Sequence, residues 1–321
     1  MTAEQPAPHP SGMPCRLAVV GVGHWGRRII ATLLETEVAQ LIAVASSQTA
    51  THELAPPGVD IVADWRALLG RSDLDGVVVA TPPATHAEIV EAAVRAGLGV
   101  LVEKPLTPDL ATTTALAERV SGERVLVDHI HLFHAAYEVL REQLAGQSIL
   151  GVRTEGGAPG PLKDDPSPLW EYGPHDAALV LDLLGEVRPT SVRVGQLPIP
   201  DGTGEEWTIE ARGGLDEGIP VQIVTGNGLA EKQRRLLVAT AEVRYLLDDR
   251  AATKLLRFPP GPLDWPGPGG ESVPISDIRL PLERVLSAFA GGLTAGETDG
   301  RWGWRLPLQV ADLLTSVERH R

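Results

Sequence analysis

The chain has 321 residues, which is enough for two hydrophobic cores of ordinary domain size. It carries 28 Lys and Arg residues against 42 Asp and Glu, and the net charge of −14 at pH 7 argues against nucleic acid or anionic membranes as partners. Its apolar runs are too short to span a bilayer, and a single cysteine, Cys15, excludes an intrachain disulfide and fits a reducing cytoplasm.

The N-terminal segment, residues 1–13, is rich in Pro, Ala and polar groups. It lacks the apolar stretch that a signal peptide requires. We therefore expect a disordered arm at the start of a cytoplasmic protein.

Residues 14–128 alternate short apolar runs with amphipathic stretches. The predicted strands are 17–20, 41–45, 59–62, 76–80, 99–102 and 124–128, and the predicted helices are 25–34, 84–96 and 108–120. Uninterrupted Val, Leu and Ala runs indicate strands buried on both faces, and the helices between them indicate parallel pairing. This region is predicted to be a doubly wound Rossmann domain of the α/β class.

Residues 129–321 show a different pattern, in which strands follow one another with fewer helices. The predicted strands are 191–194, 206–211, 219–224, 234–240 and 243–247, and the predicted helices are 174–184, 282–289 and 306–320. Several of these strands alternate polar and apolar residues, as half-solvated antiparallel strands do. We expect an α+β domain with a mainly antiparallel open sheet, which binds substrate and mediates oligomerisation, and a loop over 258–270 whose role the sequence leaves open.

A glycine-rich turn follows the first predicted strand and opens a helix. Gly21, Gly23 and Gly26 form G-x-G-x-x-G, with His24 and Trp25 between the last two glycines. The glycines allow a tight turn, close approach of backbone to a pyrophosphate, and close packing of helix on strand. This context predicts a dinucleotide site, against the alternative of a tight turn without a ligand.

The end of the second strand normally carries an acidic residue that holds the ribose of NAD. Here Ser46 and Ser47 stand there, and the nearest carboxylate, Glu53, lies well beyond the strand. Hydroxyl groups can donate to a 2′-phosphate, although no arginine accompanies them. We therefore expect NADP rather than NAD, with NAD left open.

Two further loops follow the fourth and fifth strands, at the carboxyl edge where ligands bind. Thr81, Pro82 and His86 are predicted to contact the cofactor, although Thr81 or Thr85 could instead only cap a helix. Glu103 and Lys104 follow the fifth strand and are predicted to contact the cofactor as well. A lysine there can stabilise developing alkoxide charge, whereas a lone lysine is more often a solvated surface group.

A Trp170-Glu171-Tyr172-Gly173-Pro174-His175-Asp176 segment precedes the predicted helix 174–184. His175 would then lie in the first helical turn, where the dipole disfavours its cation and leaves an imidazole suited to proton exchange. Glu171 could orient that ring, and Trp170 could form the floor of a sugar pocket. The alternative is a helix-capping cluster around Asp176.

Three histidines raise the question of a metal. His129 and His131 would share one face of a strand, with His134 just beyond. No further Cys or acidic ligand is clearly placed. We predict no metal site and expect His131 to contact substrate.

Taken together, these motifs resemble the Gfo/Idh/MocA oxidoreductase family from Cys15 onward: G-V-G-H-W-G, T-P-P-x-x-H, E-K-P and the element opening the second domain occur in the same order. The resemblance implies Lys104 and His175 as the catalytic pair beside a nicotinamide, with Glu171 where the family usually has Asp. It also implies a second sheet that lines the substrate and often forms an oligomer interface, so we expect a homodimer or homotetramer.

The leading hypothesis is an NAD(P)-dependent dehydrogenase or reductase acting on the CH–OH group of a sugar, cyclitol or nucleotide sugar. Two alternatives remain open: a non-catalytic sensor that binds dinucleotide, and redox-assisted elimination or hydrolysis on the same scaffold. The sequence names neither the substrate nor the direction of reaction.

Overall fold

The computed structural model describes residues 13–47, 56–160, 166–200, 202–214, 218–296 and 298–321. These residues form two compact units, one from 1–130 and 280–308 and the other from 131–279 and 309–321. The predicted arm (apart from Met13) and Glu53 lie outside the described residues.

The first unit contains a six-stranded parallel sheet in the order β3-β2-β1-β4-β5-β6. Its strands are β1 (Arg16–Val20), β2 (Gln40–Ala45), β3 (Asp60–Val62), β4 (Gly76–Val79), β5 (Gly99–Glu103) and β6 (Val125–Asp128). Its helices are α1 (His24–Thr36), α2 (Pro83–Arg95) and α3 (Leu110–Arg119). This strand order is that of a dinucleotide-binding Rossmann sheet and confirms the predicted fold.

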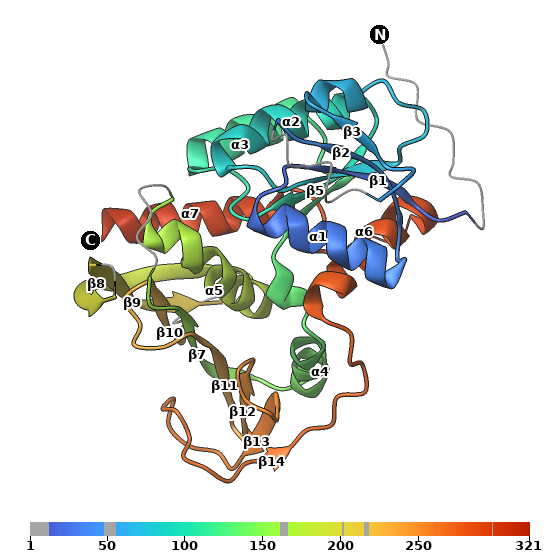
Figure 1. Ribbon diagram of the computed structural model, residues 1–321. Helices are drawn as coiled ribbons and strands as arrows, with labels where there is room; N and C mark the ends of the chain where they lie inside the picture. Colours follow the sequence, from blue (N-terminus) through green and yellow to red (C-terminus); the bar gives the residue numbers. More distant parts are fainter. Residues whose placement is uncertain (1–12, 48–55, 161–165, 201, 215–217, 297) are drawn as a thin grey trace. The chain divides into compact units, whose positions relative to one another are not determined.

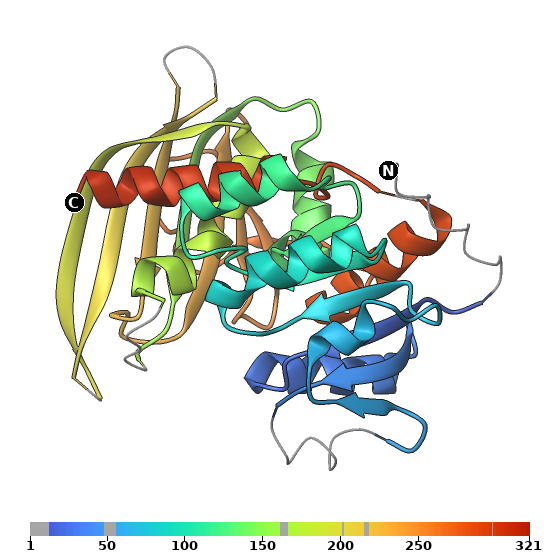
Figure 2. The ribbon, with the colours of Figure 1, turned by 90° about the horizontal axis from the view of Figure 1, so that it is seen from above.

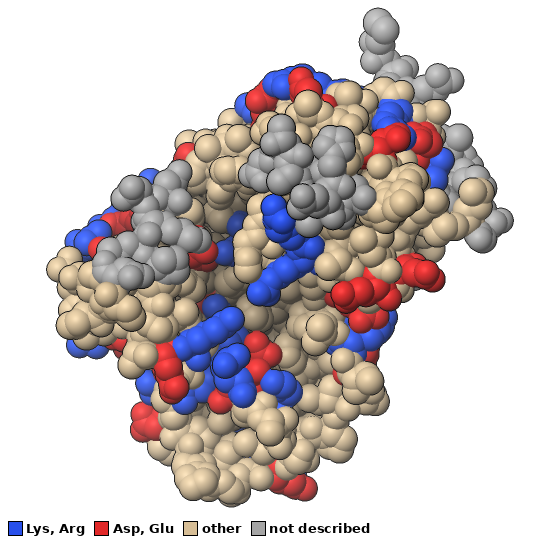
Figure 3. All heavy atoms as spheres, viewed as in Figure 1, with Lys and Arg blue, Asp and Glu red and all other residues tan. Residues whose placement is uncertain are grey.

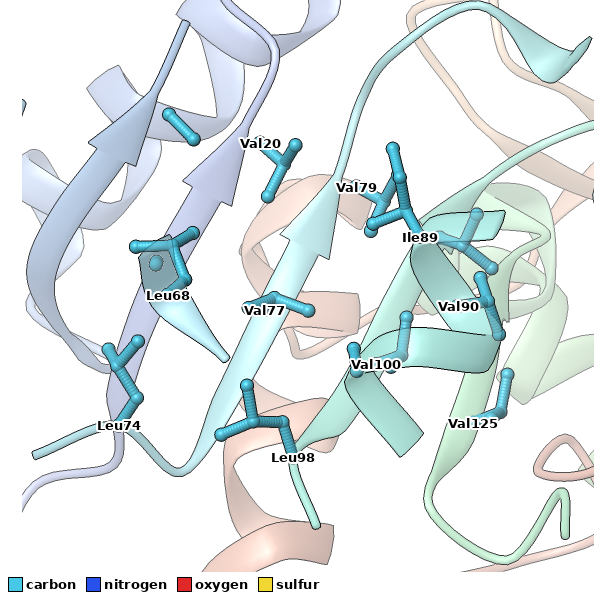
Figure 4. Packing of buried hydrophobic residues seen from close by; sticks show 14 of the residues in the cluster. Val20, Leu68, Leu74, Val77, Val79, Ile89, Val90, Leu98, Val100 and Val125 are labelled. Atoms are coloured by element: carbon cyan, nitrogen blue, oxygen red, sulfur yellow. The ribbon is translucent and has the colours of Figure 1, made fainter. Parts of the chain in front are cut away.

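Helices cover both faces of this sheet, with α2 and α3 on one face and α1 on the other (Figure 1). The interiors of β1, β4, β5 and β6 are buried, and Val77, Val79 and Val100 pack against Ile89 and Val90 of α2 (Figure 4). Continuous apolar strands therefore reflect burial on both faces, as the sequence predicts.

Helix α6 (Pro281–Ala295) also belongs to the first unit, whereas the predicted boundary assigns it to the second domain. Leu293 fills the space left by Gly76 and Gly99, where a Cβ would overlap its side chain. Phe289 stacks on Trp302 with ring centroids 5.7 Å apart. The boundary differs because Leu293 contacts strands that lie 194 and 217 positions earlier in the chain, at Gly99 and Gly76, and nothing local in the sequence signals such contacts.

The second unit is built on an eight-stranded sheet in the order β14-β13-β12-β11-β7-β10-β9-β8. Its elements are α4 (Ala135–Leu144), β7 (Ile149–Gly157), α5 (Pro168–Leu184), β8 (Val187–Ile199), β9 (Gly202–Gly213), β10 (Ile219–Gly226), β11 (Gln233–Thr240), β12 (Arg244–Asp248), β13 (Leu255–Phe258) and β14 (Glu271–Ser272). Every pairing is antiparallel except that of β10 with β7, which confirms a mainly antiparallel sheet. In Figure 2, β8 and β9 run side by side at its outer edge. Helix α7 (Arg305–Arg319) closes the chain.

The predicted loop of 258–270 crosses this sheet and is attached to it through Trp265. The guanidinium groups of Arg153 and Arg235 lie 4.8 and 4.5 Å from the Trp265 ring. Arg235 also pairs with Glu155. Figure 3 shows basic side chains mixed with acidic ones on the face where Figure 1 draws β7, β10 and β11. The loop is therefore held by charged and aromatic contacts that composition does not reveal.

Among the described residues, no helix is both long and apolar enough to cross a membrane.

Candidate active site

The glycine turn after β1 packs tightly on one side and is open on the other. Gly21 has φ +97°, and a Cβ there would stand 2.6 Å from the carbonyl oxygen of Ala80. A Cβ on Gly26 would overlap the carbonyl oxygen of Gly21. At Gly23, by contrast, no heavy atom of the described residues lies within 4 Å of the Cβ position. The first and third glycines thus serve packing, and the second leaves backbone exposed.

Helix α1 begins at this open position. Gly23 is its N-cap and provides no side-chain cap, and the first turn, with His24 and Trp25, contains no acidic residue. The Arg28 guanidinium lies 5.3 Å from the Trp25 ring. Uncapped amides and the positive end of the helix dipole form a site suited to a phosphate group. A pyrophosphate therefore fits this turn, and Arg28 adds a nearby positive charge that the glycine motif alone does not predict.

Ser46 and Ser47 directly follow β2, next to the same turn. The Gly21 amide donates to the Ala45 carbonyl oxygen at 2.9 Å, which ties the turn to the end of β2. The Ser46 amide donates to Val62 at 2.9 Å. Both serines are thus placed beside the glycine turn, as a residue that contacts the adenosine ribose must be.

His86 does not offer its ring to a ligand, which corrects its predicted contact with the cofactor. The side chain is fully buried. Its Nε2 lies 2.8 Å from the Thr81 carbonyl oxygen, and its Nδ1 lies 3.1 Å from that of Pro105. Burial lowers the pKa of His86, and the surrounding carbonyl groups oppose that shift. His86 therefore joins the loop after β4 to the loop after β5.

Neither threonine caps α2 in the way considered above. Pro82 is the N-cap, without a side-chain hydrogen bond to the helix amides. The Thr85 hydroxyl donates to the Pro82 carbonyl oxygen at 2.8 Å and lies 2.8 Å from the Thr81 hydroxyl. Thr81 and Pro82 remain at the carboxyl edge of the sheet, where the cofactor contact is predicted.

Glu103 ends β5 at the same edge, and Lys104 directly follows it. Lys104 is half-buried, and the Lys104–Pro105 peptide bond is cis. Glu103 is buried, and its register partner in the adjacent strand is Asp128, the last residue of β6. The Glu103 carboxyl group therefore lies beside the Asp128 carboxyl group. This buried position does not favour the predicted contact of Glu103 with the cofactor. The sequence did contain a signal for Asp128, because two buried apolar runs each end in an acidic residue.

In the second unit, α5 begins at Pro168, so the predicted start at Pro174 is wrong. Pro174 lies inside the helix, where it lacks an N–H for the preceding turn. His175 is consequently about two turns from the N-terminus, and the dipole argument for a neutral imidazole does not apply to it. The mistake arose because proline favours the first turn but also occurs in helix interiors that packing stabilises.

Glu171 and His175 lie four residues apart on α5 and thus share a face of the helix. The His131 ring meets the His175 ring edge to face, with centroids 4.8 Å apart. Residues 130–133 form a short 3-10 helix, so His129 and His131 do not share a face of a strand as predicted. The structure therefore brings together three of the residues expected to act on substrate: His131, Glu171 and His175.

Asp176, next to His175, anchors α5 to the sheet. It is fully buried, pairs with Arg234 of β11 at 3.0 Å, and accepts a hydrogen bond from Thr225 of β10 at 3.1 Å. Burial raises the pKa of Asp176, and Arg234 opposes that shift. A Cβ on Gly156 would overlap the Arg234 guanidinium. Asp176 is therefore not a helix cap, and it fixes the orientation of the helix that carries His175.

The side chains of Trp170 and His134 are engaged in contacts within the protein. Trp170 is only 5% exposed, which leaves little of its face for a sugar. His134 accepts from the Ala136 amide at the start of α4, and its Nε2 lies 3.1 Å from Asp249. Among the described residues, no group of three or more His, Cys, Asp or Glu side chains is arranged to hold a metal ion.

The predicted site residues thus form two groups. The glycine turn, the serines, Thr81 and Lys104 gather at the carboxyl edge of the first unit's sheet, and His131, Glu171 and His175 gather in the second unit. The joint action of Lys104 and His175 stays a prediction.

Comparison with known proteins gives consistent results. Residues 15–129 match an oxidoreductase family, GFO_IDH_MocA, described by its NAD-binding Rossmann fold. The chain is 31% identical over 238 residues to UDP-N-acetylglucosamine 3-dehydrogenase of Acidithiobacillus ferrooxidans, covering 70% of each. It is 35% identical to a protein of Magnetospirillum magnetotacticum MS-1 whose crystal structure is described as that of an oxidoreductase, with a TM-score of 0.83, covering 95% of this chain and 99% of the other.

Other curated relatives match over a shorter stretch. A dTDP-3,4-didehydro-2,6-dideoxy-alpha-D-glucose 3-reductase of Saccharopolyspora spinosa is 32% identical over 141 residues, which is 42% of each chain. The match therefore spans about two fifths of the length of that relative.

Proposed function

Because the chain belongs to the Gfo/Idh/MocA oxidoreductase family, we propose that it is an NAD(P)-dependent dehydrogenase or reductase acting on a sugar, cyclitol or nucleotide sugar. The observation that carries this proposal is the open, uncapped turn at Gly23, at the carboxyl edge where Lys104 also lies. Relatives named for reactions on nucleotide sugars support a polyhydroxylated substrate.

The bound nicotinamide would supply hydride chemistry at its C4 position. The backbone at Gly23 and the first turn of α1 would hold the pyrophosphate. The Lys104 ammonium would donate a hydrogen bond to the substrate oxygen and stabilise negative charge as it develops there. His175 would accept the hydroxyl proton during oxidation and return it during reduction.

Glu171 and His131 would support His175. The Glu171 carboxylate, one helical turn away, would balance the charge that His175 gains when it accepts a proton from substrate, and the edge-to-face contact with His131 restricts the orientation of the ring. Hydroxyl groups at Ser46 and Ser47, without a carboxylate, favour NADP over NAD. A homodimer or homotetramer and a cytoplasmic location stay predictions.

The first experiment is a thermal-shift screen with NAD(H) and NADP(H), followed by sugars, inositols and nucleotide sugars on the cofactor-saturated protein. Ligands that bind only the native state raise the melting temperature by mass action. A larger shift with NADP(H) is the expected result, and no shift with any of these nucleotides would overturn the proposal.

The second experiment measures turnover of the substrate found in that screen. Lys104→Ala and His175→Ala should each lower kcat/KM by at least about 100-fold, the usual contribution of a proton-transfer group. The matched controls are Lys232→Ala and His320→Ala, which remove exposed side chains of the same kinds. Full activity of both test variants would refute the assigned roles. Cofactor binding without turnover across the whole panel would favour a sensor.

A further inference from the structure

Two carboxyl groups meet at the carboxyl edge of the first unit's sheet. Glu103 ends β5 and Asp128 ends β6, and the two residues are register partners in adjacent parallel strands. Glu103 is 8% exposed and Asp128 is 3% exposed. Because they are register partners, their side chains leave the sheet on the same side, and two adjacent carboxyl groups can hydrogen-bond to each other only when one of them holds a proton.

The surroundings do not compensate for two negative charges. Glu103 Oε1 and Asp128 Oδ1 are buried, and neither has a hydrogen-bond partner among the described residues. Burial and the Asp128 charge raise the pKa of Glu103 well above its usual range, and burial raises that of Asp128 to about 7. Two adjacent carboxylates removed from water cannot both ionise without a large cost, so such a pair retains a proton.

Lys104 directly follows Glu103 in the chain, and His129 directly follows Asp128. The Lys104 charge lowers the pKa of both carboxyl groups and so opposes the effect of burial. Burial, with a smaller contribution from Lys104, lowers the pKa of His129 to about 4, which keeps that ring neutral. His86 faces the carbonyl groups of Pro105 and Leu106. Lys104 is therefore the one cation among the described groups found to act on the pair.

We propose that Glu103 and Asp128 share one proton and together present a single negative charge to Lys104, so that both are positioning residues for that lysine. The proposal rests on the function proposed for Lys104 above. One shared negative charge balances one ammonium group, which keeps Lys104 protonated and able to donate to the substrate oxygen. Loss of the shared proton at higher pH adds a second negative charge, which makes the ammonium a weaker acid.

The shared proton can be observed directly by infrared spectroscopy, because a protonated carboxyl group absorbs separately from a carboxylate. The test variants are Glu103→Gln and Asp128→Asn, whose amide groups can donate to the remaining carboxylate and remove the need for a proton. Glu123→Gln, an exposed change on the turn before β6, is the matched control.

At about pH 8, above the pKa of Asp128, the wild type and the control should show one protonated carboxyl group that is absent from both test variants. Absence of that signal from the wild type, or its persistence in both variants, would overturn the proposal. Because two variants address one proton, failure of either to fold leaves the other informative. No substrate is needed, so this result is independent of the proposed function.

The pH profile of turnover separates positioning from a general structural effect. We expect an inflection in the wild-type kcat/KM near neutral pH that moves by more than about one pH unit in both variants. A structural role would instead lower activity by the same factor at every pH, and that result would contradict positioning through Lys104. If no substrate turned over, the proposed function would be contradicted while the spectra still decided the shared proton.

Discussion

Alanine substitutions at Gly23 and Gly26 separate nucleotide binding from packing within one short turn. At Gly23 the backbone has φ −64° and ψ −166°, which alanine adopts without strain, and the Cβ position is open. We expect Gly23→Ala to change the free energy of unfolding by about 1 kcal/mol or less, the difference between Gly and Ala at an N-cap. The added methyl would, however, stand where backbone must approach the pyrophosphate, so nucleotide affinity should fall at least tenfold, or about 1.4 kcal/mol.

Gly26→Ala should instead lower the free energy of unfolding of the protein even without nucleotide. Its Cβ would overlap the Gly21 carbonyl oxygen, and a backbone atom cannot rotate away as a side chain can. Helix α1 must therefore shift from β1, and overpacking of this kind costs about 1–3 kcal/mol. At about 2–4 °C per kcal/mol for a domain of this size, a clear fall in melting temperature is expected even without nucleotide.

Thermal unfolding with and without NADP(H), together with calorimetric titration, measures both quantities. Gly23→Ala should melt near the wild-type temperature and lose the nucleotide-dependent shift, whereas Gly26→Ala should already melt lower without ligand. If Gly23→Ala bound nucleotide as tightly as the wild type, the placement of the pyrophosphate at this turn would be refuted.

Three further predictions concern the buried residues Asp176 and Asp128 and the loop residue Trp265. Asp176→Asn leaves the Arg234 guanidinium without its counter-charge, so backbone amides of β10 and β11 should lose about 3–5 kcal/mol of protection against hydrogen exchange. The double variant that also carries Arg234→Met should regain much of this protection. Trp265→Ala removes two cation–π contacts worth about 0.5–1 kcal/mol each, so a protease should cleave the loop of 259–270 faster than in the wild type. An unchanged cleavage rate would show that Trp265 does not hold the loop on the sheet. The pKa of Asp128 is about 7 in the folded chain and about 4 when unfolded, so the folded state binds more protons between these pH values. The free energy of unfolding should therefore fall as pH rises from about 4 through 7, and it should fall less steeply in Asp128→Asn.

Much of the first unit follows from sequence because its signals are local. Runs such as 76–79 and 99–102 are apolar at every position, which only a strand covered on both faces tolerates, and each predicted strand there is found within about two residues. The glycine turn is equally local, since three glycines at fixed spacing between strand and helix leave few other structures possible.

The second unit shows where local signals fail. Pro174 and Gly173 suggested a helix start, but the favourable packing of α5 on β7 and β10 carries the helix back to Pro168. Strand β7 and helix α4 escaped prediction, and β7 contains three glycines that local propensity places outside strands. Gly156 is tolerated in β7 because Arg234 occupies the volume that a side chain would need.

The sequence by itself determined the alternation of buried strands and helices in the first unit, the dinucleotide turn and the residue types after each strand, because each depends on neighbours within a few positions. Only the tertiary structure decided the partners of those residues: His86 with the Pro105 carbonyl oxygen, Glu103 with Asp128, Asp176 with Arg234, and His131 with His175. Strand register and helix packing set these pairs, and they join segments that periodicity and composition treat as independent.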